Sequence, residues 1–159
     1  MYAKEIEMEI NLAEYCVDTI LATIPQYIFW KDLNSVYRGC NNNYAKIAGF
    51  NSPKEIIGKT DIDLPWAKYT QEIYRQEDLA IINHKLEILN KEVPLLTASG
   101  EEKIILVSKV PLFDKANKVI GVLGIFTDIT TQKLLEKSLR SEKLKAEAAN
   151  VAKTEFIEN

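Results

Sequence analysis

Residues 119–139 constrain the fold most strongly, because they begin as a β-strand pattern and end as a helical one. Residues 119–126 form a nearly continuous apolar run, V-I-G-V-L-G-I-F, which is rich in β-branched side chains and predicts a buried strand. Asp128 and Thr130 then offer oxygens that can cap a helix, and a charged, leucine-spaced segment follows. A core strand that continues into an exposed helix must move that helix when it shifts. Asp128, Ile129 and Thr130 are therefore the predicted junction between this strand and this helix.

The composition limits the classes of protein that remain. A length of 159 residues and a hydrophobic content of 47% suit one domain with helical extensions. The net charge of −3 gives no basic excess, so no nucleic-acid partner is expected. No apolar run approaches the roughly 18 residues of a membrane span. Cys16 and Cys40 show no metal-ligand spacing and no disulfide framework, so we expect a reducing, cytoplasmic setting without direct membrane contact.

Residues 1–24 are predicted to form an amphipathic helix that Pro25 ends. Its apolar positions alternate spacings of four and three, which is the pattern of a heptad seam; the predicted seam includes Ile6, Ile10, Ala13 and Val17. Two interpretations stay open at this point. The helix either packs on its own domain or pairs with the same helix of a second copy.

The intervening residues 25–130 predict an α+β domain. Apolar and β-branched runs indicate strands at residues 27–30, 36–40, 87–96, 103–113 and 119–126, with short helices over 41–66 and a longer helix over 67–85. Short links between the strands favour an antiparallel sheet, with the inserted helices covering one face. The last strand is apolar on both faces, so the other face also needs a cover, and we expect the N-terminal helix to supply it.

The ordered set of motifs in this region resembles a PAS domain. The matching segments are F-W-K-D at 29–32, N-N-N-Y-A-K-I-A-G at 41–49, E-I-I-G-K-T at 55–60, D-I-D-L-P-W at 61–66, Y-R-Q-E-D at 74–78, S-K-V-P-L at 108–112 and I-G-V-L-G at 120–124, followed by the D-I-T junction. The resemblance covers roughly residues 18–130. It implies a five-stranded antiparallel sheet with short helices on one face, in a sensory or dimerising module.

A second resemblance lies at the end of the chain. Residues 146–159, A-E-A-A-N-V-A-K-T-E-F-I-E-N, resemble the start of the dimerisation helix of a sensor histidine kinase, just before its phosphoacceptor histidine. The one histidine, His84, lies far away in sequence, so residues 131–159 would be a signalling coiled-coil helix that leads into an absent kinase core. The parent would then be an ATP-dependent protein-histidine kinase with a response-regulator partner, and its membrane attachment is left open.

The chain itself is not expected to be an enzyme. It contains no glycine-rich phosphate loop and no nucleophile elbow, and His84 has no recognisable serine or cysteine partner. The PAS resemblance would place a haem-ligating histidine near Glu77 or Asp78, whereas His84 ends the long helix. It would place a flavin-reactive cysteine within residues 60–66, where none occurs. No metal or cofactor is therefore predicted, and an unidentified small-molecule ligand remains an option.

The PAS resemblance also implies a ligand cavity between the sheet and the short helices. The predicted lining residues are Phe29, Tyr44, Trp66, Tyr74, Ser108 and Leu123, with Arg75, Asp78 and Lys109 as polar groups near the mouth. Two simpler interpretations accompany this prediction. The aromatic side chains can instead fill the core, and Arg75 with Asp78 can form an ordinary ion pair on one helix face.

The apolar register of the last helix slips along its length. Leu135 and Leu139 define one seam, whereas Leu144, Ala148 and Val151 define another, as in a coiled-coil stutter. The slip is either a harmless irregularity or a point where two helix packings are close in energy and the upstream strand selects between them. All five residues are predicted dimer contacts.

The favoured prediction is a sensory and dimerisation PAS module of a two-component sensor histidine kinase. Its signal would pass from the last strand through the junction to a coiled-coil helix in a homodimer. The alternatives are a structural dimerisation spacer that binds no ligand and a haem- or flavin-bearing redox or light sensor. Regulation of a nucleotide or diguanylate cyclase is disfavoured by the F-I-E-N ending at residues 156–159.

Overall fold

The computed structural model describes residues 2–159, apart from the side chain of Tyr69, and has an α+β fold. The strands are β1 (Tyr27–Asp32), β2 (Tyr37–Cys40), β3 (Ile88–Leu96), β4 (Glu102–Phe113) and β5 (Val119–Asp128). The helices are α1 (Tyr2–Thr23), α2 (Asn42–Ile47), α3 (Ala67–His84) and α4 (Thr130–Glu158), with short 3-10 helices η1 (Pro53–Ile56) and η2 (Asp61–Asp63). The predicted five-stranded antiparallel sheet with flanking helices is confirmed.

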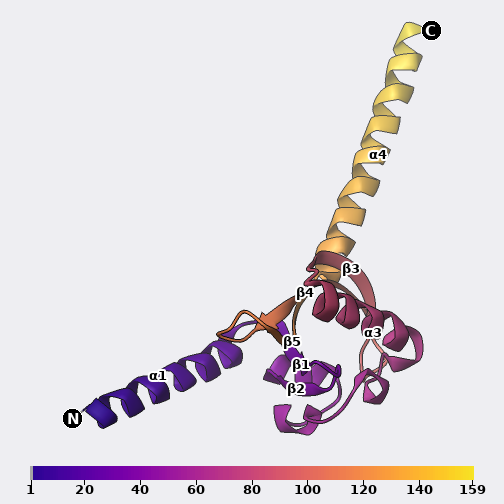
Figure 1. Ribbon diagram of the computed structural model, residues 1–159. Helices are drawn as coiled ribbons and strands as arrows, with labels where there is room; N and C mark the ends of the chain where they lie inside the picture. Colours follow the sequence, from indigo (N-terminus) through magenta and orange to yellow (C-terminus); the bar gives the residue numbers. More distant parts are fainter. Residues whose placement is uncertain (1) are drawn as a thin grey trace.

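The strand order is β2-β1-β5-β4-β3, so β5 is the central strand of the sheet. In β5, Gly124 lies opposite Phe29 of β1 and Lys109 of β4, and paired residues of antiparallel strands point to the same face. Phe29 and Lys109 therefore share the inner face, which α2, α3 and the short helices cover (Figure 1). The ring of Phe29 occupies the space that a Cβ at Gly124 would need, so a glycine is required there.

The start of α2 is joined directly to β1. The Asn41 side-chain carbonyl accepts hydrogen bonds from the backbone N–H groups of Tyr44 and Ile28, both at 3.1 Å. One amide thus caps the helix and holds it against the strand. Gly49 follows the helix with a left-handed φ of 87°, which a residue with a side chain rarely adopts. As a result, the Tyr44 ring is held inside the core, where it is 1% exposed.

The N-terminal helix does not cover the outer face of the sheet, and this prediction was wrong. None of the residues Tyr2–Thr23 of α1 is buried, and Figure 1 shows the helix pointing away from the sheet. Hydrogen bonds from Asn43 Nδ2 to the carbonyls of Ile24 and Pro25, each 3.2 Å long, fix the direction in which the helix leaves β1. Residue 1 of the predicted helix lies outside the described residues.

The outer face of the sheet consequently keeps apolar side chains at least partly in solvent. They include Ile104, Leu106, Val110 and Leu112 of β4 and Leu123 and Ile125 of β5. α1 therefore does not pack on its own sheet, and its pairing with a second copy stays a prediction. None of the helices described within residues 2–159 is both long and apolar enough to cross a membrane.

The central strand continues almost directly into the last helix. Asp128 ends β5, and α4 begins at Thr130 and runs for 29 residues (Figure 1). None of the residues Thr130–Glu158 is buried. Even the apolar side chains of Leu135 and Leu139 are 61% and 67% exposed. The helix therefore projects from the sheet with its apolar seam unpaired in the single chain.

Candidate functional site: an aromatic cavity and a strand–helix junction

A small cavity lies between the inner face of the sheet and the covering helices. Its volume is about 30 Å³, which leaves room for roughly two water molecules. Five of the predicted pocket residues line it: Phe29, Tyr44, Trp66, Tyr74 and Lys109. Side chains thus occupy most of the core in this conformation, so a larger ligand would have to displace aromatic rings.

Three other predicted pocket residues lie elsewhere. Ser108 pairs with Ile125 and therefore points to the outer face, and so does Leu123, which pairs with Val110 two positions along β4. The Ser108 hydroxyl accepts a hydrogen bond of 3.0 Å from the backbone N–H of Asn90. Arg75 lines a separate surface groove next to η2. The prediction failed for Ser108 and Leu123 because a one-residue change in a strand reverses the face.

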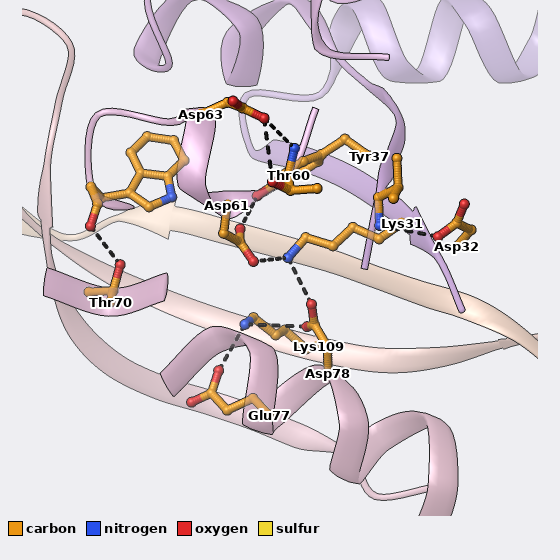
Figure 2. Close-up of polar contacts among 12 residues, drawn as sticks. Lys31, Asp32, Tyr37, Thr60, Asp61, Asp63, Thr70, Glu77, Asp78 and Lys109 are labelled. Atoms are coloured by element: carbon orange, nitrogen blue, oxygen red, sulfur yellow. Dashed lines mark hydrogen bonds and ion pairs between the residues drawn. The ribbon is translucent and has the colours of Figure 1, made fainter. Parts of the chain in front are cut away.

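A buried ion cluster borders the cavity (Figure 2). Lys31 Nζ lies 2.6 Å from Asp61 Oδ2 and 2.8 Å from Asp78 Oδ2. Tyr37 donates its hydroxyl proton to Asp61 Oδ1 at 2.7 Å, so the 2.8 Å contact between the two phenols requires Tyr44 to donate to Tyr37. Burial raises the pKa of both phenols well above the ordinary value, so they stay neutral donors at physiological pH.

Asp78 is buried beside Lys31 rather than exposed at the mouth of the cavity, and its ion-pair partner is Lys31 rather than Arg75. Its side chain is 0% exposed, which excludes the predicted ion pair on the solvent face of the helix. Among the described residues, Asp78 Oδ1 has no hydrogen-bond partner, although Lys109 Nζ lies 3.8 Å away. A buried carboxylate oxygen left in this state is a candidate acceptor for a water molecule or a ligand donor.

Glu77, the neighbour of Asp78 on α3, holds two lysines. Its Oε2 lies 2.8 Å from Lys109 Nζ, and its Oε1 lies 2.6 Å from Lys91 Nζ. Lys109 Nζ also lies 4.4 Å from the centroid of the Tyr74 ring, within cation–π range. Burial acts to raise the pKa of Glu77, but Lys109 and Lys91 together hold it below its ordinary value. Glu77 is therefore a carboxylate at neutral pH.

The one histidine and the two cysteines of the sequence are the residues that bear on haem or flavin binding. His84 is the last residue of α3, and acidic residues in ion pairs occupy positions 77 and 78. Burial raises the pKa of the Cys40 thiol to about 11, so that thiol is protonated and unreactive, whereas Cys16 is exposed on α1. Within residues 2–159, no cluster of three His, Cys, Asp or Glu side chains is arranged to hold a metal ion.

Sequence reasoning missed several residues of this site. Lys31 could have been found, because residues two apart in a strand share a face and Phe29 was already assigned to the pocket. Tyr37 and Asp61 gave no local signal, since their contacts depend on how β2 and η2 fold against β1. The further residues that line the cavity or its ion cluster are Glu77, Val93, Leu95, Ile105, Val107 and Phe126.

The strand–helix junction is held by a second polar cluster. Asp128 Oδ1 accepts hydrogen bonds from the Thr130 backbone N–H at 2.9 Å and from its hydroxyl at 2.6 Å. Asp128 Oδ2 lies 2.8 Å from Lys103 Nζ. The Thr130 hydroxyl oxygen accepts a bond from the backbone N–H of Ile104, and the Ile129 N–H donates to the Ile104 carbonyl. The first turn of α4 is thus attached to β4 as well as to β5.

Replacing Asp128 by alanine is expected to loosen this attachment. The variant loses the ion pair to Lys103 and both bonds to Thr130, so the unfolding free energy should fall by about 1–3 kcal/mol. Hydrogen–deuterium exchange in residues 131–137 should accelerate. The matched control is Asp114→Ala, which removes a similar turn-forming carboxylate from the β4–β5 loop. Equal exchange of residues 131–137 in the two variants would contradict this role.

The fold and the cavity together define a class of protein. They are a five-stranded antiparallel sheet beside a small aromatic cavity and a central strand that continues into a projecting helix. Residues 21–134 match the family model described as the PAS fold, and the chain therefore belongs to the PAS family. It is a PAS sensory domain, and such a domain is not itself catalytic.

Solved structures share this fold at low sequence identity. VqmA bound to DPO is 24% identical, with a TM-score of 0.65 over 69% of this chain and 55% of that chain. The PAS domain of a Colwellia psychrerythraea protein is 21% identical (TM-score 0.61; 75% and 98% covered). The PAS domain of Bordetella pertussis BvgS is 18% identical (TM-score 0.60; 85% and 98% covered). The chain spans about half the length of VqmA, and these likenesses concern the fold alone. A comparison with curated proteins found no significant match.

Proposed function

We propose that this chain is the sensory and dimerisation module of a two-component sensor histidine kinase. A signal at the cavity changes the sheet, and β5 passes that change through Asp128, Ile129 and Thr130 to α4. The observation that carries the proposal is the exposed leucine seam of α4, because a helix with unburied Leu135 and Leu139 needs a partner. The same helix of a second copy supplies that partner. The module works in the cytoplasm, and the kinase acts on a response regulator.

The cavity would take a small, uncharged molecule. Three ammonium groups (Lys31, Lys91 and Lys109) face three carboxylates (Asp61, Glu77 and Asp78), so the charges of the cluster already balance. An ion would disturb that balance and would also lose its hydration. A flat body would pack against the aromatic rings, with an acceptor towards the Lys109 ammonium and a donor towards Asp78 Oδ1. The solved structure of VqmA bound to DPO shows that a protein of this fold can be found with a ligand.

A second candidate is an input module for a DNA-binding domain. One neighbour of 24% identity is described as a VqmA–ligand–DNA complex, and the fold shared with it would allow α4 to lead into such a domain. The negative net charge and the resemblance of residues 146–159 to a kinase dimerisation helix favour the kinase instead. In either case the cavity and the junction perform the same role.

Native mass spectrometry of the 159-residue chain tests the module. We expect a dimer that the double variant Leu135→Lys/Leu139→Lys dissociates, because the substitutions place charges in the apolar seam. The control Lys137→Glu/Lys143→Glu changes two charges on the same helix without changing these leucines and should stay dimeric. A monomeric wild type would overturn the dimer, and the same spectrum reports any bound small molecule.

The kinase assignment needs a second measurement on the same dimer. The chain is joined in helical register, after Asn159, to the phosphoacceptor helix and the catalytic domain of a histidine kinase. A one-residue insertion between Leu139 and Leu144 should change autophosphorylation, because it rotates the downstream seam by about 100°. Unchanged autophosphorylation would exclude the relay through α4 and leave a structural dimerisation spacer.

A further inference from the structure

Two neighbouring residues of β3 make ion pairs with two different helices. Lys91 Nζ lies 2.6 Å from Glu77 Oε1 of α3, and Glu92 Oε1 lies 2.7 Å from Lys133 Nζ of α4. Lys91 pairs with Val107 and Glu92 with Leu106, so the two side chains point to opposite faces of the sheet. The peptide unit that joins Lys91 to Glu92 in β3 therefore connects a contact with α3 to a contact with α4.

The inner end of this connection reaches the cavity. Glu77 Oε2 lies 2.8 Å from Lys109 Nζ, and Lys109 lines the cavity with its side chain only 4% exposed (Figure 2). Glu77 thus divides one carboxylate between the buried Lys109 and Lys91, whose side chain is 46% exposed. A group in the cavity that draws the Lys109 ammonium away leaves the Glu77 carboxylate with Lys91 as its remaining ion-pair partner. The strength of the Lys91–Glu77 ion pair then changes. The position of Lys91 would then depend on whether the cavity is occupied.

The strand at this point is able to adjust. β3 is an edge strand of the sheet, and its pairing with β4 is irregular between Ile88 and Lys91. Asn90, in the irregular segment, has a left-handed φ of 53°, and its N–H is held by the Ser108 hydroxyl. Such an irregularity lets the first residues of β3, including Lys91 and Glu92 next to it, shift while residues 93–96 keep their ladder with β4. Glu92 and its contact to Lys133 would follow that shift.

We propose that Glu77 is a positioning residue that couples the cavity to the first turns of α4 through Lys91 and Glu92. This connection runs in parallel with the Asp128 junction and reaches the same helix from the edge strand β3 instead of the central strand β5. It rests on the proposed sensory function, since it describes how the state of that cavity is passed on. When Glu77 releases the lysines, the Glu92–Lys133 contact loosens and the first turns of α4 open more often.

Hydrogen–deuterium exchange of the 159-residue chain tests the coupling without a known ligand. In Glu77→Gln, the backbone amides of residues 133–137 should exchange roughly two- to fivefold faster, the change expected when a partly exposed ion pair is lost. Exchange in β1 and β5 should stay unchanged. Lys91→Met should reproduce the effect, and the double variant should show no more than either single variant, because the two residues act in one chain of contacts. Glu92→Gln removes the contact to Lys133 directly and sets the upper limit.

The matched control is Glu72→Gln, which removes a charge from an exposed position of the same helix. It should leave residues 133–137 unchanged. Unchanged exchange in Glu77→Gln, or faster exchange throughout the sheet, would overturn the inference, because the ion pair would then be local or merely structural. An unaffected α4 in a chain that is still a dimer overturns this inference alone, whereas a monomeric wild type overturns the proposed function.

Discussion

Lys31→Met should lower the free energy of unfolding by about 3–5 kcal/mol, which is the cost of leaving buried charges without their partner. The Lys31 side chain is 1% exposed, and its ammonium is the ion-pair partner of both Asp61 and Asp78, whose side chains are 7% and 0% exposed. Without it, two carboxylates remain inside the core with no counter-ion at hydrogen-bond distance. Urea unfolding followed by circular dichroism, at one fixed protein concentration because the chain is proposed to dimerise, measures the change.

The control for this prediction is an ion pair of the same kind at the surface. Arg38 contacts Asp32 at 2.7 Å with its side chain 53% exposed, so Arg38→Met should cost less than about 1 kcal/mol. A second variant separates charge from packing. Adding Asp61→Asn and Asp78→Asn to Lys31→Met removes the stranded charges and should recover part of the loss. Equal costs for Lys31→Met and Arg38→Met would contradict the cluster's importance to stability.

Phe29→Ala should be about equally damaging, with a loss of about 3–5 kcal/mol in the free energy of unfolding. The Phe29 ring is 4% exposed, covers Gly124 and lies 4.9 Å from the Tyr44 ring between centroids. Its removal merges a ring-sized space with the existing cavity. The enlarged cavity is apolar on most sides, so we expect benzene to raise the midpoint of thermal unfolding of the variant but not that of the wild type.

Phe113→Ala is the matched control for this second prediction. Phe113 ends β4 and is 43% exposed, so its truncation removes the same side chain without opening a cavity. A loss of stability well below that of Phe29→Ala is expected, with no response to benzene. If benzene stabilised both variants equally, binding would not be at the cavity that Phe29 helps to fill.

Local sequence features predicted the elements of the fold well. Asn41 caps the start of α2 and Gly49 follows its end, within the region where short helices were predicted, and the apolar run of residues 119–126 predicted a buried strand. Each of these features acts over a few residues, through a capping hydrogen bond, a backbone conformation or an alternation of side chains. The PAS resemblance added the arrangement of those elements in one sheet.

The candidate site was predicted only in part, and the strand registers explain the difference. Lys109 was placed near the pocket, whereas its neighbour Ser108 was assigned to the same pocket and lies on the other face. Sequence alternation separates the two faces of β4 but does not say which face meets the helices. The covering helices decide that, and they also decide that Asp78 points inward to Lys31 instead of outward to Arg75.

The sequence by itself determined where strands and helices begin and end and that a strand continues into a helix at Asp128 and Thr130. Only the tertiary structure decided that α1 leaves the sheet uncovered and that Lys31 meets partners 30 and 47 residues away. The physical reason is one of range. Caps, turns and side-chain alternation act between near neighbours in the chain, whereas a buried ion pair exists only when distant segments pack in one register and water is excluded from between them.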